Sequence, residues 1–406
     1  MQTNILEELQ ETVEGAEAER ILRNCVHCGF CNATCPTYQL LGDELDGPRG
    51  RIYLMKDMLE GGEVSKRTQR HLDRCLTCRN CETTCPSGVE YGKLVDIGRE
   101  MVEQRVKRPW HERLFRGVLR RVLPEPGRFG PLLHTGQAVR PLLPAALKAK
   151  VPERVEAPAW PEPRHARRML VLEGCVQPAL SPQINARAAR VLDRLGISLV
   201  TAAGAGCCGA VDQHLGAPDT AADRMRANID AWWPHVEAGA EAVVMTASGC
   251  GALVREYAYH LRDDPEYAER AARISALTRD LGEILADEDL TPLQPAGPGR
   301  IAFQCPCTLQ HAQGLNGVVE GVLRRLGVEL APVDEPHLCC GSAGTYSILQ
   351  PELAGSLRAR KLATLTAGDP EAILTANIGC LHHLAAGSDR PVRHWVEWVD
   401  AALDGN

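Results

Sequence analysis

The chain lacks any long apolar run: no stretch approaches the roughly 20 uninterrupted apolar residues that a membrane-spanning helix needs. Residues 1–19 are acidic and polar, without the basic and apolar segments of a secretory signal. Aromatic residues make up 4% of the sequence and the net charge is −7, so nothing indicates a nucleic-acid partner. We therefore expect a cytoplasmic protein of two or three domains, each burying its own core, attached at most to a membrane surface.

Cysteine, by contrast, is abundant, with 17 residues in 406. Without a secretory signal these thiols should stay reduced, which disfavours a disulfide framework. Most of the cysteines fall into regularly spaced groups, and such groups in a reduced chain are typical of metal binding. We therefore expect metal ligands.

Two copies of one cysteine motif lie in residues 1–105, and each follows the spacing C-x2-C-x2-C-x3-C-P. The spacing matches the run found in bacterial ferredoxins and predicts two 4Fe–4S clusters. The resemblance to those ferredoxins implies crossed ligation. One cluster would be held by Cys25, Cys28, Cys31 and Cys85, and the other by Cys35, Cys75, Cys78 and Cys81.

Zinc is the main alternative, because it uses similar spacings. A four-cysteine zinc site needs only two CxxC pairs, so one thiolate in each run would have no role. Between the motifs, helical patterns span residues 49–59 and 66–74, and residues 21–24 continue a helix into the first motif. These patterns predict a mostly helical dicluster domain.

Residues 166–295 and 296–406 are similar to each other. Cys175 precedes the pair Cys207-Cys208 with 31 residues between, and Cys307 precedes Cys339-Cys340 with the same 31. Strands are predicted at 169–172, 197–200, 242–246, 301–303 and 372–375, with helices at 184–195 and ending near 326. The predicted fold class is therefore α+β and multi-domain, with a helical dicluster ferredoxin domain followed by two tandem α/β repeats.

The second half resembles the CCG (cysteine-rich) domain of heterodisulfide reductase subunits. The candidate ligands of a third centre are Cys175, Cys207, Cys208, Cys250, Cys307, Cys339, Cys340 and Cys380. The glycine after each pair, Gly209 or Gly341, should allow a positive φ. The family's terminal CxxC is incomplete in both copies, so each offers four thiolates, with His383 or Cys305 as candidate completing ligands; thiol-only and structural roles are the alternatives. A buried structural role is favoured for Cys305, and core or surface roles for His311, His337, His382 and His394.

Residues 106–165 form a basic, Pro- and Arg-rich linker with no cysteine; residues 107–164 hold twelve Lys or Arg against five Asp or Glu. Apolar residues from Leu114 to Val122 alternate with arginines at helical spacing. This stretch could rest on an anionic membrane surface, or pack between domains or against a partner subunit. The sequence does not decide between these two roles. Packing between domains or against a partner subunit is the favoured one.

Over nearly its whole length the chain resembles the iron–sulfur subunits of bacterial glycolate oxidases (glycolate dehydrogenases). The resemblance is strongest in residues 25–31, 42–51, 75–86 and 339–345. The resemblance implies a non-flavin electron-transfer subunit, not catalytic alone, with no catalytic residue of its own. It would take electrons from flavin-containing glycolate dehydrogenase subunits, which convert glycolate to glyoxylate, and pass them to a quinone or membrane-side acceptor. The implied location is cytoplasmic, with peripheral attachment to the inner face of the cytoplasmic membrane as a candidate.

Three other functions were weighed: an iron–sulfur subunit of a lactate dehydrogenase, a heterodisulfide-reductase-like catalytic subunit, and a redox sensor. The missing CxxC cysteines disfavour the second, and the lack of a recognisable signalling module disfavours the third. One GxGxxG occurs at Gly204–Gly209, but it contains the cysteine pair, and Gly216 and Pro218 interrupt the helix that should follow. We do not expect a dinucleotide there.

Overall fold

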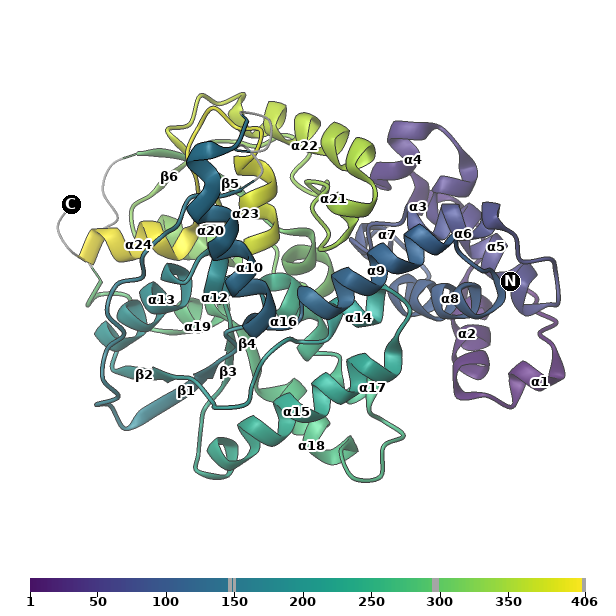
Figure 1. Ribbon diagram of the computed structural model, residues 1–406, viewed down its shortest axis with the longest axis horizontal. Helices are drawn as coiled ribbons and strands as arrows, with labels where there is room; N and C mark the ends of the chain where they lie inside the picture. The colour runs from purple at the N-terminus through teal and green to yellow at the C-terminus, as the bar shows by residue number, and fades with distance from the viewer. Residues whose placement is uncertain (145–147, 149–150, 294–298, 404–406) are drawn as a thin grey trace.

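The computed structural model describes residues 1–144, 148, 151–293 and 299–403. The molecule is elongated, with the N-terminal helices at one end and two α/β repeats at the other (Figure 1). The predicted boundary between residues 295 and 296 lies outside the described residues.

The N-terminal region is helical, as predicted. Its elements are α1 (Glu7–Gln10), α2 (Val13–Asn24), α3 (Phe30–Ala33), α4 (Pro36–Leu41), η1 (Glu44–Asp46), α5 (Pro48–Leu59), α6 (Lys66–Asp73), α7 (Asn80–Thr83) and α8 (Tyr91–Arg105). Local signals explain the boundaries: Thr12 caps α2 through a bond from Gly15 N, and Ser65 with Thr68 forms a capping box on α6. Ile21, Met55, Leu72 and Leu94 pack in one buried cluster between these helices.

Each repeat contains a four-stranded parallel sheet, and the two sheets have equivalent strand orders, β2-β1-β3-β4 and β6-β5-β7-β8. The strands are β1 (Arg167–Val171), β2 (Ile197–Val200), β3 (Val243–Met245), β4 (Thr278–Asp280), β5 (Arg300–Gln304), β6 (Glu329–Leu330), β7 (Ala372–Thr375) and β8 (Val392–His394). The tandem repeat and its predicted strands are confirmed. Strands β4, β6 and β8 were not predicted, because each has at most three residues and no apolar run.

Helices cover both sheets. In the first repeat they are α12 (Gln177–Leu180), α13 (Gln183–Arg194), α14 (Ala210–His214), α15 (Pro218–Glu237), α16 (Ser248–Val254), α17 (Tyr257–His260), α18 (Ala268–Leu277) and α19 (Leu281–Asp287). In the second they are η3 (Thr308–Ala312), α20 (Val318–Arg325), α21 (Tyr346–Leu349), α22 (Pro351–Thr366), α23 (Ile378–Ala385) and α24 (Trp395–Leu403).

The two repeats share a core. The largest buried cluster joins Val171 and Val244 of the first sheet to Phe303 and Leu374 of the second. The packing is reciprocal, since α19 of the first repeat packs on α20 of the second while α24 of the second packs on α13 of the first. The expectation that each domain buries its own core is therefore incomplete for the repeats: each has a buried cluster of its own, and a further cluster is shared between the two sheets.

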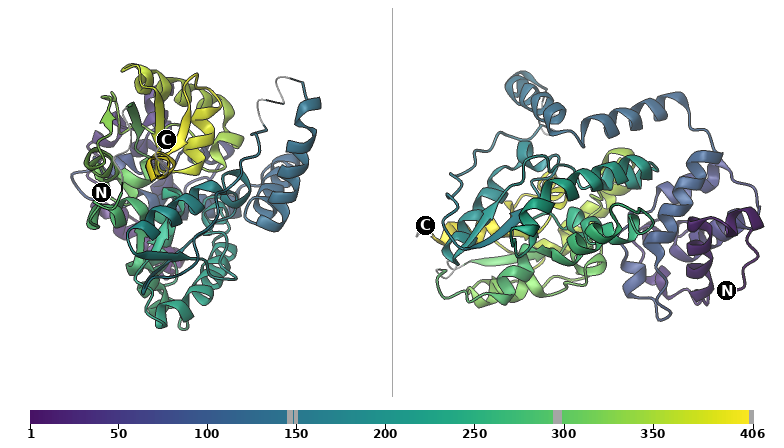
Figure 2. Two further views of the ribbon diagram at one scale, coloured as in Figure 1. Left: turned by 90° about the vertical axis from the view of Figure 1, so that its left-hand side faces the viewer. Right: turned by 90° about the horizontal axis from the view of Figure 1, so that it is seen from below.

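The middle segment forms α9 (Trp110–Val122), α10 (Pro126–Val139) and η2 (Arg140–Leu142). These helices run along one outer side of the molecule, from the N-terminal region to the first repeat (Figure 2). Two arginines of α9 face inward: Arg116 pairs with Asp73 at 3.0 Å and Arg120 with Asp212 at 2.8 Å.

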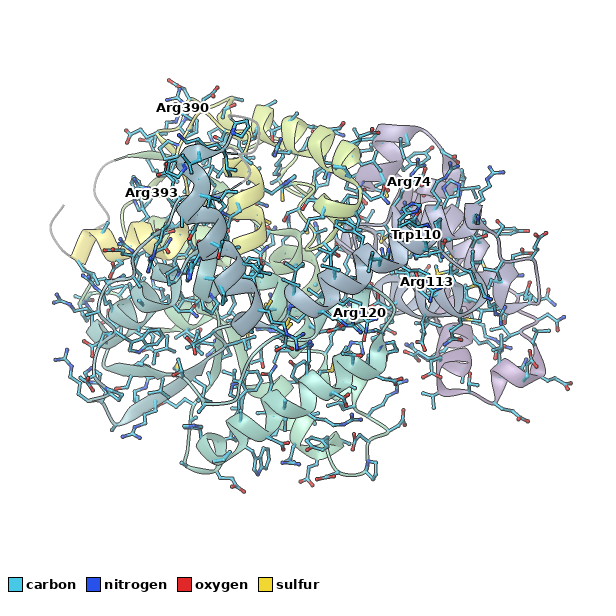
Figure 3. All side chains as sticks on the ribbon, in the orientation of Figure 1. Arg74, Trp110, Arg113, Arg120, Arg390 and Arg393 are labelled. Carbon is cyan, nitrogen blue, oxygen red and sulfur yellow. The ribbon has the colours of Figure 1, made fainter. Side chains whose placement is uncertain are left out.

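The apolar side of α9 therefore faces outward. Trp110, Leu114 and Val118, at helical spacing of four, are 75%, 60% and 47% exposed. Trp110 and Arg120 lie near opposite ends of this helix (Figure 3). The segment thus does bridge the two regions, but through its arginines rather than its apolar residues.

Candidate metal centres

The two ferredoxin motifs have the same unusual backbone. His27 and Thr77, equivalent in the motifs, have φ of 60° and 53°; Gly29 and Arg79, also equivalent, have φ of 86° and 59°. Positive φ is costly for a β-branched residue such as Thr77, and such strain is concentrated at functional sites. These left-handed residues lie in the loops that carry the thiols, and Gly29 and Arg79 directly precede the short helices α3 and α7.

One group of thiols includes the exposed Cys28. Cys25, Cys28, Cys31 and Cys85 line one pocket, together with Cys81; Cys31 and Cys85 are half-buried and Cys25 is buried. Burial, together with the nearby sulfurs of Cys25 and Cys85, raises the pKa of the Cys31 thiol to about 11. We call these four residues the outer set.

A second group is buried. Cys35, Cys75, Cys78 and Cys81 are all at most 9% exposed. Burial raises the pKa of Cys81, and the nearby sulfurs of Cys78, Cys75 and Cys35 raise it further. We call these four residues the inner set. Grouped by the predicted crossed ligation, the eight thiols thus form one set in which only Cys25 is buried and one in which all four are buried.

Polar side chains that the sequence analysis missed surround the inner set. Thr37 Oγ1 lies 3.3 Å from Cys35 Sγ, and Tyr91 Oη lies 3.7 Å from Cys75 Sγ. The guanidinium of Arg51 is 1% exposed, lies within electrostatic reach of Cys35 and Cys75, and donates to the carbonyl of His71 at 2.7 Å. Only position in the fold identifies these residues, because none has a distinctive spacing in the sequence.

The spacing of the thiols argues against a single zinc ion. Tetrahedral zinc with Zn–S bonds of about 2.3 Å requires sulfurs about 3.8 Å apart. Within the part of the chain that the structure describes, the only three His, Cys, Asp or Glu residues whose ligand atoms lie within 4.8 Å of one another are Asp43, Asp46 and His71. In that group Asp46 is already neutralised by Arg74 at 2.7 Å. The wider thiol groups fit a cluster better than one ion.

Each repeat gathers its four candidate thiols at the ends of its strands. In the second repeat Cys307 Sγ lies 3.6 Å from Cys339 Sγ, and hydrogen-bonding contacts continue from Cys339 to Cys340 and from Cys340 to Cys380. In the first, the same chain of contacts runs through Cys175, Cys207, Cys208 and Cys250. The position beyond the strand ends is that of ligand sites in parallel sheets.

The glycine after each cysteine pair has the predicted positive φ, 100° at Gly209 and 91° at Gly341. In both repeats its N–H donates to the first sulfur of the pair, at 3.4 Å from Cys207 Sγ and 3.4 Å from Cys339 Sγ. This N–H stabilises a thiolate. The GxGxxG stretch is therefore a thiol loop, and α14 after it has five residues and ends at His214, as its interrupted pattern predicted.

The two candidate completing ligands contact backbone and core atoms, and His383 does so beside the thiol loop, because it also bonds the backbone of Cys340. His383 Nε2 lies 3.2 Å from the carbonyl oxygen of Ala354. Cys305 is 3% exposed and packs in the shared core, which fits the favoured structural role. The other histidines also make structural contacts: His311 with Thr83, His382 with Ser181, and His394 with the carbonyl of Thr246.

The inner set and the second repeat meet directly. Cys78 packs with Cys307 and Cys339 in one buried cluster, and Asn80 Nδ2 donates to the carbonyl of His337 at 3.1 Å. Cys208 of the first repeat packs instead with Met225 and Tyr257, within its own repeat. The two repeats therefore differ in what their thiols face.

Comparison with known proteins agrees with this architecture. Residues 21–89 match the 4Fe-4S dicluster domain, and residues 169–255 and 301–385 match the cysteine-rich (CCG) domain. The glycolate oxidase iron–sulfur subunit of Escherichia coli (strain K12) is 59% identical over 100% of both chains. The chain belongs to the family of glycolate oxidase iron–sulfur subunits.

More distant relatives separate the alternatives. The probable glycolate oxidase iron–sulfur subunit of Bacillus subtilis (strain 168) is 31% identical over 95% of this chain and 93% of its own. Lactate utilization protein A of Geobacillus kaustophilus (strain HTA426) is 26% identical, over 56% of this chain and 96% of its own. Membership of the glycolate oxidase family confirms the predicted fold class and iron–sulfur chemistry, and the lactate alternative has only distant support.

Proposed function

We propose that this chain is the electron relay of a glycolate dehydrogenase: it accepts single electrons from a flavin subunit that oxidises glycolate to glyoxylate, and passes them to a quinone-side acceptor. The observation that carries the proposal is the sorting of eight thiols into an outer and an inner set, too widely spaced for single ions. Bound clusters would supply one-electron chemistry, and the chain's own residues position and insulate them.

We assign the ligands by set. Cys25, Cys28, Cys31 and Cys85 hold the outer 4Fe–4S cluster, and Cys35, Cys75, Cys78 and Cys81 hold the inner one. The shared electrostatic influence of the sulfurs within each set supports the assignment. The four thiols of each repeat are candidate ligands of a further centre. Because Cys78 packs with Cys307 and Cys339, a centre in the second repeat would lie nearer the inner set.

The outer set is where the flavin subunit would dock. Electron transfer requires close approach, and three of the four outer thiols, those of Cys28, Cys31 and Cys85, are less buried than the inner thiols. Val26 and Phe30, which flank Cys28, are 67% and 62% exposed, and Tyr53 beside His27 is also exposed. This apolar surface around a cysteine would be covered in a complex.

The outward face of α9 would rest on the membrane. Trp110, Leu114, Phe115 and Val118 are exposed there, and Arg113 and Arg121 are exposed beside them. An amphipathic helix with an aromatic residue and flanking arginines suits the interface of an anionic bilayer. Among the described residues, no helix is both long and apolar enough to cross a membrane. We therefore propose peripheral attachment to the inner face of the cytoplasmic membrane.

Vesicle binding tests this attachment. Leu114→Glu should reduce co-sedimentation with phosphatidylglycerol vesicles about tenfold or more, because it places a charge in the apolar face. Val13→Glu, at an exposed valine of α2, is the matched control and should bind like the wild type. Equal binding by both variants would contradict membrane attachment through α9.

The division of the chain follows from these roles: residues 1–105 as the dicluster domain, 106–165 as the bridging segment, and 166–295 and 296–406 as the CCG repeats. The relay itself is tested by iron and sulfide quantitation with electron paramagnetic resonance (EPR) on protein purified without oxygen. We expect two 4Fe–4S signals, and glycolate-dependent dye reduction only when the flavin subunit is added. A folded, active chain free of iron would refute the proposal.

A further inference from the structure

Tyr346 lies where the ferredoxin region meets the second repeat. It is the first residue of α21 and follows the loop that carries Cys339 and Cys340. Its ring is 6% exposed and packs in the same buried cluster as Cys78, Cys307 and Cys339. One aromatic side chain thus contacts thiol-bearing segments of both regions.

The hydroxyl of Tyr346 is buried without a hydrogen-bond partner among the described residues. Burying a hydroxyl without a hydrogen bond is unfavourable, so we expect a group absent from the described residues to accept a hydrogen bond from Tyr346. The other buried tyrosines near thiols have theirs: Tyr91 Oη lies 3.7 Å from Cys75 Sγ, and Tyr257 Oη donates to the carbonyl of Cys208 at 2.8 Å. Tyr346 differs from them because its buried hydroxyl has no acceptor among the described residues.

The surroundings of Tyr346 identify the acceptor. Its hydroxyl lies within electrostatic reach of Arg51, Cys75 and Cys339. Arg51 has only donors, so it cannot accept a hydrogen bond from Tyr346. Cys75 belongs to the inner set, and Cys78 of the same set packs in one buried cluster with Tyr346. The acceptor that fits is a sulfur atom at the inner cluster site.

We propose that Tyr346 donates a hydrogen bond to a sulfur of the inner 4Fe–4S cluster and thereby raises the reduction potential of that cluster. This inference rests on the proposed function. A hydrogen bond to sulfur stabilises the reduced cluster, which carries one more negative charge. With both clusters bound, one electron would pass from the outer to the inner site, oxidising the first cluster and reducing the second, with no bond broken and no proton transferred. Tyr346 is a positioning residue that favours the inward direction of electron flow.

The test is Tyr346→Phe in the full chain, purified without oxygen, with potentials measured by EPR-monitored redox titration. Iron and sulfide content should be unchanged, because no ligand is lost. The potential of the inner cluster should shift to more negative values while that of the outer cluster stays the same. The inner signal is identified as the one that Cys28→Ala leaves intact.

Two matched proteins complete the test. Tyr257→Phe removes an equally buried hydroxyl from the first repeat and should shift neither ferredoxin potential. Incorporation of 3-fluorotyrosine at position 346 keeps the hydroxyl and makes it a stronger donor, so the inner potential should shift to more positive values. If Tyr346→Phe loses iron, the protein with 3-fluorotyrosine tests whether the hydroxyl of Tyr346 sets the inner potential.

The outcomes separate the two proposals. A wild-type chain without two 4Fe–4S clusters would refute the proposed function. A wild-type chain with both clusters, whose inner potential does not move in either position-346 protein, would refute only the role of Tyr346. A shift confined to a centre in the second repeat would also refute it, because the acceptor would then be Cys339 or its neighbours.

Discussion

The two ferredoxin motifs have identical spacing and equivalent left-handed residues, yet they lie in different surroundings. The first motif carries Cys28 to the surface between exposed Val26 and Phe30, whereas Cys78 of the second is buried against Cys307 and Cys339. Spacing thus determines what each loop can bind. The neighbours determine whether the bound group faces solvent or the protein interior.

The two CCG repeats also place equivalent thiols in different surroundings. Both gather four thiols with the same N–H to sulfur bond from a glycine, but only the second repeat packs its thiols beside a ferredoxin thiol, as far as the described residues extend. The duplicated units therefore place equivalent thiols in two different surroundings. The following predictions test whether these paired sites are as unequal as their surroundings.

The largest effect is expected at the ferredoxin cysteines. Cys78→Ala should remove the inner cluster, about half of the ferredoxin iron, and abolish glycolate-dependent dye reduction in the complex, because the relay is cut. It should also lower thermal stability, since the inner set is buried at the contact with the second repeat. Cys28→Ala removes an exposed ligand and should leave the fold and the inner signal intact. Iron analysis, EPR and thermal unfolding measure these effects. An equal loss of stability in the two variants would contradict the difference in burial between Cys78 and Cys28.

The next largest effect separates the repeats. Cys340→Ala should reduce the rate of dye reduction about tenfold or more if a centre in the second repeat continues the path, with a size typical of losses around metal sites. Cys208→Ala, at the equivalent position of the first repeat, should reduce it less. Unchanged iron content and activity in both variants would assign the repeats a purely structural role.

Two arginines near the two thiol sets differ in burial. Arg51→Gln should lower the free energy of unfolding by about 3 kcal/mol, because it leaves buried Asp46 without one of its cations. Arg49 pairs with Glu44 at the surface, so Arg49→Gln should cost less than about 1 kcal/mol. Denaturant unfolding of the anaerobic proteins measures both, and a reversal of the order would contradict the contrast in burial.

Equivalent positions in the repeats should respond oppositely to pH. Asp280 ends β4 and His394 ends β8, and each N–H donates to a glutamate three residues later, at 2.8 Å for Glu283 and 2.9 Å for Glu397. Burial raises the pKa of Asp280 from 3.8 to about 7 and lowers the pKa of His394 from 6.5 to about 4. Asp280 therefore contributes stability that is lost as pH rises from 3.8 to 7. His394 contributes stability that is lost as pH falls from 6.5 to 4.

In the wild type these two slopes oppose each other. Asp280→Asn should leave a stability that rises by about 2 kcal/mol between pH 5 and 7, and His394→Gln one that falls by a similar amount. Urea unfolding across this pH range measures both slopes. Parallel slopes in the two variants would show that these groups do not control the response.

The smallest expected difference is at the two glycines. Both have positive φ, so alanine is strained at either by about 1 kcal/mol. A Cβ at Gly341 would lie 2.7 Å from the carbonyl oxygen of Ala354, whereas one at Gly209 would lie 3.2 Å from that of Ala221. Gly341→Ala should therefore destabilise by about 1 kcal/mol more than Gly209→Ala. Thermal unfolding compares them, and an equal cost would remove this asymmetry.

Much of the fold could be predicted because its signals are local. Motif spacing, the duplicated CCG pattern and the apolar runs of β1, β2, β3, β5 and β7 all lie within short stretches of chain, and the helical spacing of α9 was also correct. Strands β4 and β8 were missed because Thr278–Asp280 and Val392–His394 are short and contain charged residues. The direction of α9 was missed because a helical pattern shows that a face is apolar but not what that face meets.

By itself, the sequence determined that the protein binds iron–sulfur clusters, which cysteines are candidates, and that its second half is duplicated, because ligand spacing and glycine positions are properties of a short loop. Only the tertiary structure decided which thiols are buried, which repeat faces the ferredoxin, and that Arg51 and Tyr346 lie beside the inner set. Burial and contact depend on residues far apart in the chain. Position 346 meets position 78 only because the packing of two domains brings them together.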